Sequence, residues 1–133
     1  EFTSERMRKL LRLVVTDGTG SRADVPGFLV GGKTGTAEKI EKGEYKAGAL
    51  LSSFIAAFPM TKPRYVVYVM LDEPRSTATD GVGGGTVAAP LAGRVIARIG
   101  PLLGVHPVDQ SSKKVKNAMA IEVVKRGPKL ATY

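Results

Sequence analysis

The sequence predicts an α+β fold in which one helix is followed by three antiparallel strands and a second helix. Two segments repeat their apolar residues at the three- and four-residue spacing of a helix face. Three segments that look extended, two of them largely apolar, lie between these helices, bounded by glycine, proline and charged turns. The connections are short enough for hairpins, which favours an antiparallel sheet.

The first helix is predicted over residues 3–17. Thr3 or Ser4 can cap its start, and the DGTG sequence that begins at Asp17 ends it. Its predicted apolar face consists of Met7, Leu10, Leu11 and Val14.

The strands are predicted over residues 28–40, 50–58 and 64–71, with a Glu-Lys-Gly-Glu turn between the first two. The third strand, RYVVYVML, is continuously apolar rather than alternating, which predicts that both of its faces are buried. The sheet should therefore be covered on two sides.

The second helix is predicted from about Thr86 to Leu103. Pro90 must lie in its first turn, because proline is tolerated there and not in a helix interior. The Gly100-Pro101 pair bends or ends it. Its predicted apolar stripe consists of Leu91, Val95, Ile99 and Leu102.

Composition excludes several kinds of site. The chain has no cysteine, which excludes disulfides, thiolate zinc sites and cysteine nucleophiles. The single histidine, His106, has no acidic or hydroxyl residue beside it, so we expect a loop residue and no metal or other cofactor. The apolar runs fall short of the roughly 20 residues that a membrane-spanning helix needs. The chain starts at Glu1 rather than methionine, so we expect a piece of a longer protein, with Glu1-Phe2 resembling a cloning remnant.

The net charge of +8 is concentrated at the C-terminal end. Residues 111–133 carry +5, and residues 1–110 carry the remaining +3. A basic tail can bind nucleic acid or an anionic membrane surface. This one contains a single aromatic residue, Tyr133, and so lacks the stacking platforms of single-strand binders. We expect a solvated tail and no binding to nucleic acid.

The segment GFLVGGKTGTAEK, residues 27–39, matches two motifs with unrelated chemistry. Gly27, Gly32, Lys33 and Thr34 fit the phosphate-loop pattern G-x-x-x-x-G-K-[ST]. Lys33, Thr34 and Gly35 also form a K-T-G triplet, a motif of certain serine acyl-transfer enzymes.

The surrounding residues favour a strand over a phosphate loop. A phosphate loop needs a buried strand before it and a helix that begins at the Lys-Thr pair. Here a polar SRADVP segment comes first, and a glycine and an early turn at Gly43 follow. Asp72, the candidate partner for magnesium, leads directly into a loop.

On a strand, alternate side chains point the same way, so Lys33 should face opposite to Thr34 and Thr36 unless a bulge intervenes. The glycines of this strand remove side chains where a substrate backbone could lie against it. These glycines are Gly31, Gly32 and Gly35.

Five segments extend the match well beyond the triplet: GTG, VPGFLVGGKTGTAEK, SSFIAAFP, RYVVYVMLDEP and GGTVAAP. In this order they resemble the C-terminal part of class B penicillin-binding proteins, the peptidoglycan transpeptidases, and most closely the cell-division type, penicillin-binding protein 3. The resemblance implies a fragment of the transpeptidase fold, a relative of the serine β-lactamases in which five antiparallel strands lie between helices. Residues 1–107 would be this portion of the domain, and residues 108–133 a basic tail.

The resemblance also implies roles for the K-T-G strand. Family members acylate a serine with the D-Ala-D-Ala end of a stem peptide and pass the acyl group to an amine, and β-lactams imitate the donor. Lys33 would supply positive charge and join the proton relay. Thr34, Gly35 and Thr36 would line the substrate wall, with both threonine hydroxyls binding the donor carboxylate. The backbone N–H of Thr36 would be an oxyanion-hole donor.

Two family motifs depart from expectation in this sequence. It contains no S-x-N, and its one S-x-x-K begins at Ser111, after the K-T-G strand and inside the basic tail, where the resemblance does not place the nucleophile. Because acyl transfer needs a nucleophile next to its base, we expect the isolated chain to be inactive. We also expect its sheet to expose apolar surface, so that it pairs with the rest of its own domain or self-associates.

The complete protein is expected at the periplasmic side of the inner membrane, with stem peptides, β-lactams and, for the septal type, cell-division proteins as partners. The alternatives are a β-lactamase, carboxypeptidase or penicillin-sensor relative, a phosphate-loop nucleotide-binding protein, and an interaction module that uses the tail. The first group shares K-T-G but not the run MLDEP followed by GGTVAAP. Titration with ATP and magnesium tests the second, and removal of residues 111–133 tests the third.

Overall fold

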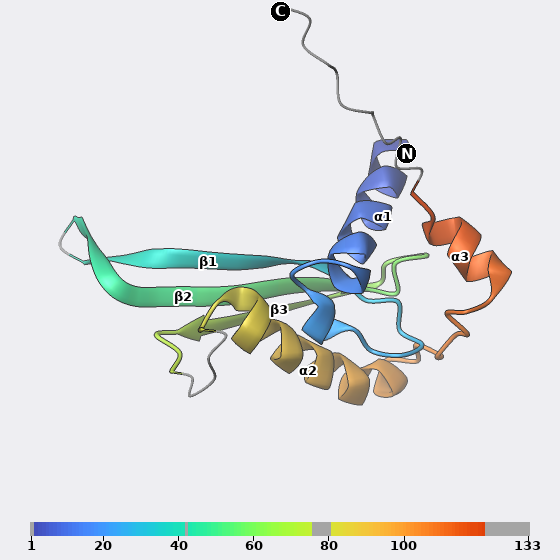
Figure 1. Cartoon of the computed structure of the whole chain (residues 1–133). Coiled ribbons are helices and arrows are strands. Elements are labelled where there is room, and N and C mark those ends of the chain that lie inside the picture. Colours follow the sequence, from blue (N-terminus) through green and yellow to red (C-terminus); the bar gives the residue numbers. More distant parts are fainter. Residues whose placement is uncertain (1, 42, 76–80, 122–133) are drawn as a thin grey trace, which may run out of the picture.

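A computed structural model describes residues 2–41, 43–75 and 81–121. Within this part the predicted order holds, because a helix is followed by three strands and a second helix (Figure 1). The helices and strands are α1 (Phe2–Thr16), a 3-10 turn (Ser21–Ala23), β1 (Gly31–Glu41), β2 (Glu44–Phe58), β3 (Tyr65–Asp72), a π-helical turn η2 (Gly84–Ala88), α2 (Ala89–Leu102) and α3 (Lys113–Met119).

The three strands form one antiparallel sheet, as predicted, and their order in it is β1-β2-β3. β1 begins at Gly31 rather than at residue 28, because Leu29 has a φ of 48° and interrupts the extended backbone. Phe28, Leu29 and Val30 instead fill the core from a loop, where each is at most 5% exposed. β2 begins at Glu44 rather than at residue 50, so the hairpin is longer than expected and projects from the body (Figure 1).

The core lies between the sheet and α2, with contributions from the segment that links α1 to β1. Phe54 and Phe58 of β2 and Ile96 of α2 are fully buried there. Small residues of α2 let the helix approach closely, since a Cβ on Gly100 would lie 2.3 Å from the ring of Phe28. The helix therefore faces the core with residues that are largely small: Ala89, Ala92, Gly93, Ile96 and Gly100.

The predicted helix faces were only partly right. Leu102, placed in the apolar stripe of the second helix, is 86% exposed, because the face that meets the core is the one with the small residues. In α1 the buried residues are Arg12 and Val15, whereas Met7 and Leu10 are about half exposed. Only the C-terminal end of α1 reaches the sheet, and its N-terminal half projects beyond it (Figure 1).

Arg12 is buried because its guanidinium has partners. Its Nη1 atom donates at 2.7 Å to the Asp24 carboxylate and at 2.7 Å to the carbonyl of Val30, just before β1. Its Nη2 atom donates to the side chain of Gln110 at 3.2 Å. This cation ties α1 to the start of the K-T-G strand.

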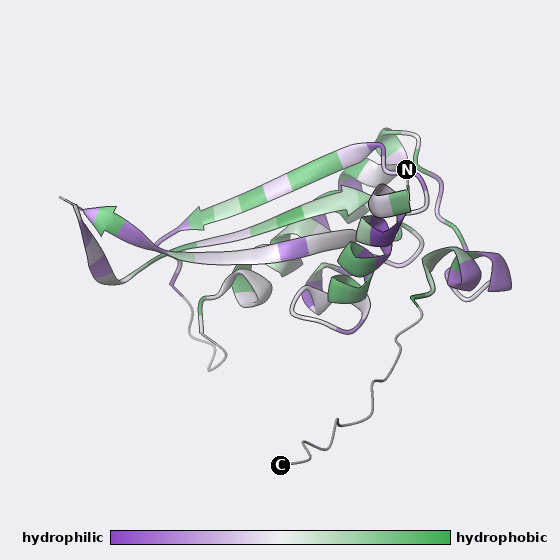
Figure 2. Ribbon diagram, turned by 90° about the horizontal axis from the view of Figure 1, so that it is seen from above, coloured by the Kyte–Doolittle hydropathy of each residue, from purple (hydrophilic) through white to green (hydrophobic). Residues whose placement is uncertain are grey.

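The expectation of a sheet covered on two sides is wrong for the described part of the chain. Burial alternates along β3, and α2 covers one face. The other face, onto which Figure 2 looks, carries an exposed apolar cluster that we call the open face. Its apolar residues are Ile55, Val66, Tyr68 and Met70, between 47% and 65% exposed. A continuous apolar run predicts that both faces of a strand are buried. It does not predict whether the elements that cover the two faces lie within these 133 residues.

Two residues just before the basic segment 111–133 are tied to the body of the fold. Val108 donates its N–H to the carbonyl of Gly27 at 3.0 Å, and Gln110 donates to the carbonyl of Val25 at 3.2 Å. Ser112 caps α3, which has no buried residue. Residues 122–133, which hold half of the basic groups of the tail, lie outside the described residues, and the boundary between 107 and 108 stays a prediction. No helix in the described part is long and apolar enough to cross a membrane.

Candidate active site

The K-T-G segment lies in the first half of β1. In the described part of the chain β1 pairs with β2 alone, so its other edge is free. The register runs without a shift from Gly31 to Glu38, as an uninterrupted strand requires. Lys33 and Thr34 lie inside this strand and not at the start of a helix, so the phosphate-loop interpretation fails.

The register separates Lys33 from the two threonines, as predicted for a strand without a bulge. Thr34 and Thr36 pair with Phe54 and Ser52, which are buried on the α2 side of the sheet. Lys33 pairs with Ile55 of the open face.

The lysine nevertheless reaches Thr34. Its Nζ atom donates to the carbonyl oxygen of Thr34 at 2.8 Å and to the hydroxyl of Thr34 at 3.3 Å. Alternation along a strand predicts opposite directions for the Cβ atoms, but it does not predict where a flexible four-carbon side chain places its end.

Two neighbouring segments contact the threonine hydroxyls, and the sequence interpretation assigned no role to either. Thr19, between α1 and β1, lies with its Oγ1 atom 3.1 Å from that of Thr34. Gly84, at the start of η2, donates its backbone N–H to the hydroxyl of Thr36 at 3.0 Å. The signal was present, because GTG and GGTVAAP are among the five segments that carry the family resemblance.

The glycines of the strand serve the protein's own packing. A Cβ on Gly32 would lie 2.4 Å from the carbonyl oxygen of Ile55, and one on Gly35 would lie 2.5 Å from the hydroxyl of Ser53. A Cβ on Gly31 would meet the side chain of Met60 at 2.7 Å. Contacts within the fold therefore already explain why these positions are glycine, and room for a substrate backbone is not needed to account for them.

Ser111 has a local structural role. Its hydroxyl donates to the carboxylate of Asp109 at 2.6 Å, and its backbone N–H donates to the same oxygen at 2.8 Å. These hydrogen bonds, the side-chain one first, hold the pKa of Asp109 below its ordinary value. The residue is exposed in the turn before α3, which fits the prediction that its S-x-x-K match is accidental.

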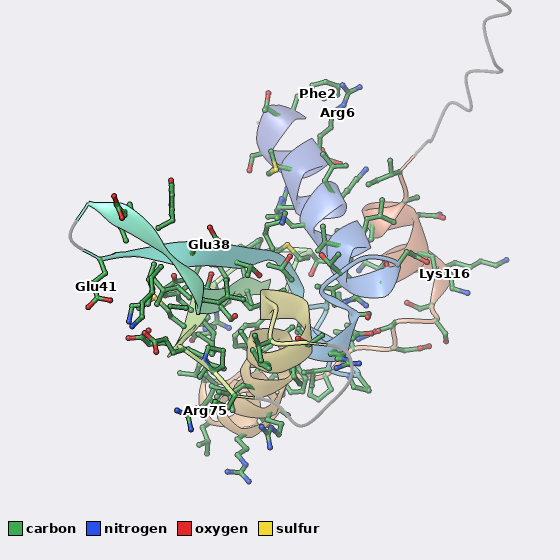
Figure 3. All side chains as sticks on the ribbon, turned by 60° about the vertical axis from the view of Figure 1, so that its left-hand side comes forward. Phe2, Arg6, Glu38, Glu41, Arg75 and Lys116 are labelled. Carbon is green, nitrogen blue, oxygen red and sulfur yellow. The ribbon has the colours of Figure 1, made fainter. Side chains whose placement is uncertain are left out.

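A charged cluster fixes the far half of β1. Lys39 pairs with Asp72 at 2.8 Å and with Glu73 at 3.0 Å, which ties β1 to the end of β3. Lys46 pairs with Glu73 and, at 3.3 Å, with Glu41, which lies at the far end of the hairpin (Figure 3). Hydrogen bonding to Asp72, followed by that to Glu73, raises the pKa of Lys39. The hydrogen bond from Lys39 is also the largest cause that lowers the pKa of Glu73.

We expect this cluster to respond to pH at both ends of the scale. The pKa of Glu73 is lower in the fold than its ordinary value of 4.5, so its stabilising contribution is complete above that value and is lost as the pH falls through the folded pKa. The pKa of Lys39 is raised above 10.5, so its contribution is complete below that value and is lost as the pH rises through the folded pKa.

Replacing Lys39 by methionine should return the pKa of Glu73 toward 4.5 in a carbon-13 NMR titration. An unchanged titration would contradict the pairing.

Comparison with known proteins decides what this arrangement belongs to. Residues 1–97 match the family described as the penicillin binding protein transpeptidase domain. The chain belongs to this family. The match confirms the resemblance drawn from the K-T-G segment and its neighbours, and the sheet with its helices is a fragment of the transpeptidase domain.

Curated relatives support the same assignment. The chain is 49% identical over 116 residues to the "Probable peptidoglycan D,D-transpeptidase FtsI" of Caulobacter vibrioides, a match that covers 79% of this chain and 20% of the relative. It is 46% identical over 107 residues to the "Stage V sporulation protein D" of Bacillus subtilis, covering 80% of this chain and 16% of the relative. The chain thus spans about a fifth or less of the length of these relatives.

Solved structures show the same fold. The transpeptidase domain of penicillin-binding protein 3 from Burkholderia pseudomallei is 38% identical with a TM-score of 0.65, over 77% of this chain and 30% of that one. Penicillin-binding protein 3 from Mycobacterium tuberculosis, complexed with ampicillin, is 33% identical with a TM-score of 0.67, over 82% of this chain and 25% of that one.

Proposed function

We propose that this chain is part of a peptidoglycan D,D-transpeptidase and forms the K-T-G wall of its active site. The observation that carries the proposal is the arrangement of Lys33, Thr34 and Thr36 on an edge strand of the described sheet, in a chain that belongs to the transpeptidase family. Lys33 is hydrogen-bonded to Thr34, and Thr36 accepts from the backbone N–H of Gly84. Two relatives are named for this activity or this domain, and a structural neighbour was solved with a β-lactam.

Each residue of the wall has a part in the proposed reaction. A serine elsewhere in the complete protein attacks the carbonyl carbon of the D-Ala-D-Ala bond, the terminal D-Ala leaves, and an amine of a neighbouring stem peptide then displaces the serine. Lys33 uses two of its three N–H donors on Thr34, which leaves one for the proton relay. The hydroxyls of Thr34 and Thr36 bind the donor carboxylate, Gly35 lies between them on the substrate wall, and the N–H of Thr36 stabilises the oxyanion.

Intact-mass spectrometry with benzylpenicillin tests the function. The complete protein should gain one drug mass, whereas the isolated 133-residue chain should stay unmodified. A complete protein that gains no mass would refute the proposal. Rapid turnover of penicillin without a lasting adduct would instead indicate a β-lactamase, and an adduct on the isolated chain would make Ser111 or another serine here a nucleophile.

The open face of the sheet is proposed to pack against the rest of the same transpeptidase domain. Four exposed apolar side chains gather there, and the chain covers only part of the length of its relatives. We expect the isolated 133-residue chain to self-associate through this face, because exposed apolar patches and unpaired strand edges promote association. Replacing Val66 and Tyr68 together by lysine should shift the sedimentation of the isolated chain to that of a monomer.

The matched control is lysine at Leu102, an exposed apolar residue on α2 rather than on the open face. This variant should associate as the parent chain does. Equal sedimentation of the double variant and the Leu102→Lys control would show that the open face does not drive association.

For the complete protein, we place the transpeptidase domain on the periplasmic side of the inner membrane and in contact with cell-division proteins. Support for this comes from the resemblance to the septal class. Protease treatment of cells with an intact or a permeabilised outer membrane tests the location. A domain on the periplasmic side should be digested only in the permeabilised cells. Crosslinking to division proteins, compared with crosslinking to proteins of cell elongation, tests the partner.

A further inference from the structure

The hydroxyl of Thr19 lies 3.1 Å from the hydroxyl of Thr34, and either oxygen can be the donor of this hydrogen bond. Thr19 follows α1 in the DGTG turn, fifteen positions before Thr34 in the chain. The turn is held against the sheet: the backbone N–H of Gly20 donates to the carbonyl of Val14 at 3.0 Å, and Gly20 is buried beside the ring of Phe54. Thr19 is thus a fixed part of the wall although it comes from another segment.

The hydrogen-bonding capacity of the Thr34 hydroxyl determines what Thr19 can do. A threonine hydroxyl has one proton to donate and two lone pairs that accept. Lys33 already donates to the Thr34 hydroxyl at 3.3 Å and so occupies one lone pair. If Thr19 donates to the second lone pair, the single proton of Thr34 is left for a ligand, and all three positions are satisfied at once.

Thr36 is arranged in the same manner. The backbone N–H of Gly84 can only donate, so its 3.0 Å contact makes the Thr36 hydroxyl an acceptor there and leaves the Thr36 proton free. The Gly84 turn is held in place by the hydroxyl of the buried Ser52, which donates to the carbonyl of Val82. Each threonine therefore has an auxiliary partner at an acceptor position: Gly84 donates to Thr36, and Thr19 is placed to donate to Thr34.

We propose that Thr19 is a positioning residue that orients the Thr34 hydroxyl as a donor toward an anionic group of the ligand. The inference rests on the proposed function, since the ligand group is the carboxylate of the stem peptide or of a β-lactam. Thr19 acts by donating to Thr34, and Thr34 then donates to the carboxylate. Hydrogen bonds to a charged acceptor are stronger than those between neutral groups, so a misdirected Thr34 proton weakens binding most when the ligand is an anion.

The test uses the complete protein and measures the second-order rate of acylation by benzylpenicillin and by its uncharged methyl ester. Thr19→Val, which removes the hydroxyl and keeps the shape, should slow acylation by the acid about tenfold. It should change the rate with the ester less than about twofold. Thr19→Ser, which keeps the hydroxyl, should restore the rate with the acid to within about twofold of the parent. In a Thr34→Val background, Thr19→Val should have no further effect.

The outcomes separate this inference from the function beneath it. If the parent protein is not acylated, the proposed function fails, and this inference fails with it. If the parent is acylated and Thr19→Val reacts with the acid at the parental rate, the inference alone is overturned. An equal loss with acid and ester, or a loss that Thr19→Ser does not rescue, would show a merely structural role and would also overturn it. If thermal unfolding shows that Thr19→Val is not folded, Thr19→Ala takes its place under the same criteria.

Discussion

Replacing Lys33 by alanine in the complete protein will lower the rate of acylation by benzylpenicillin by about 10² to 10⁴-fold, the usual contribution of a group that takes part in proton transfer. The lysine is exposed, and its ammonium contacts the carbonyl and the hydroxyl of Thr34. Its removal takes away the positive charge and the remaining N–H donor of the proposed relay. Stopped-flow measurement with a fluorescent penicillin gives the rate, and intact mass confirms that the same adduct forms.

The fold should survive this change. Substitutions at exposed positions that have no special packing role usually alter stability by less than about 0.5 kcal/mol, so thermal unfolding of Lys33→Ala should match that of the parent. The matched control is Lys46→Ala, which removes an exposed strand lysine at the other end of the sheet and should leave the acylation rate unchanged. Acylation of Lys33→Ala within about twofold of the parental rate would remove Lys33 from the catalytic machinery.

Much of the fold followed from local patterns. Helical spacing predicted α1 and α2, and short apolar runs between turns predicted the three strands in their correct order. The failures came from tertiary contacts. Arg12 is buried because Val30 and Asp24 lie within reach, and no local pattern identifies such partners. The small residues of α2 meet the core, so its bulky Leu102 is left in solvent.

The site was predicted only in part, again because tertiary contacts cannot be seen in local sequence patterns. The K-T-G strand could be identified because its site residues, Lys33 to Thr36, are consecutive in the sequence and the segments around them match the family. The contacts of Thr19 and Gly84 could not, because they join segments that are 15 and 48 residues away from their partners in β1. A sequence motif marks which residues stand together in the chain. Only the fold shows which hydroxyls lie within hydrogen-bond distance of partners from other segments.

The second large effect is expected at Gly84, where an added methyl group has no space. A Cβ there would lie 2.3 Å from the carbonyl oxygen of Ser53 and 2.5 Å from that of Gly35. Both oxygens belong to the backbone of paired strands, so neither can move without disturbing the β1–β2 ladder. Gly84→Ala should therefore lower the free energy of unfolding by about 1–3 kcal/mol, the range for overpacked sites. Urea unfolding of the complete protein measures this change.

Gly83 provides the matched control one residue earlier. Its φ of −68° and ψ of 162° suit any residue, and a Cβ there would be 3.6 Å from the hydroxyl of Thr36, an ordinary contact distance. Gly83→Ala should be neutral or stabilise by up to about 1 kcal/mol, because alanine has less conformational freedom in the unfolded chain. Gly84→Ala is thus expected to lower the unfolding midpoint and Gly83→Ala is not, and equal midpoints for the two variants would contradict the close packing of this turn.

Acylation should separate the same pair of variants. To relieve its contacts, the Gly84→Ala turn must move away from the sheet, and its N–H then leaves the hydroxyl of Thr36. Thr36 is then free to turn its proton away from the ligand, and acylation by benzylpenicillin should slow about tenfold or more under conditions in which the variant is still folded. Gly83→Ala keeps the turn in place and should react at the parental rate. A folded Gly84→Ala protein that reacts as fast as the parent would show that the N–H of Gly84 does not orient Thr36.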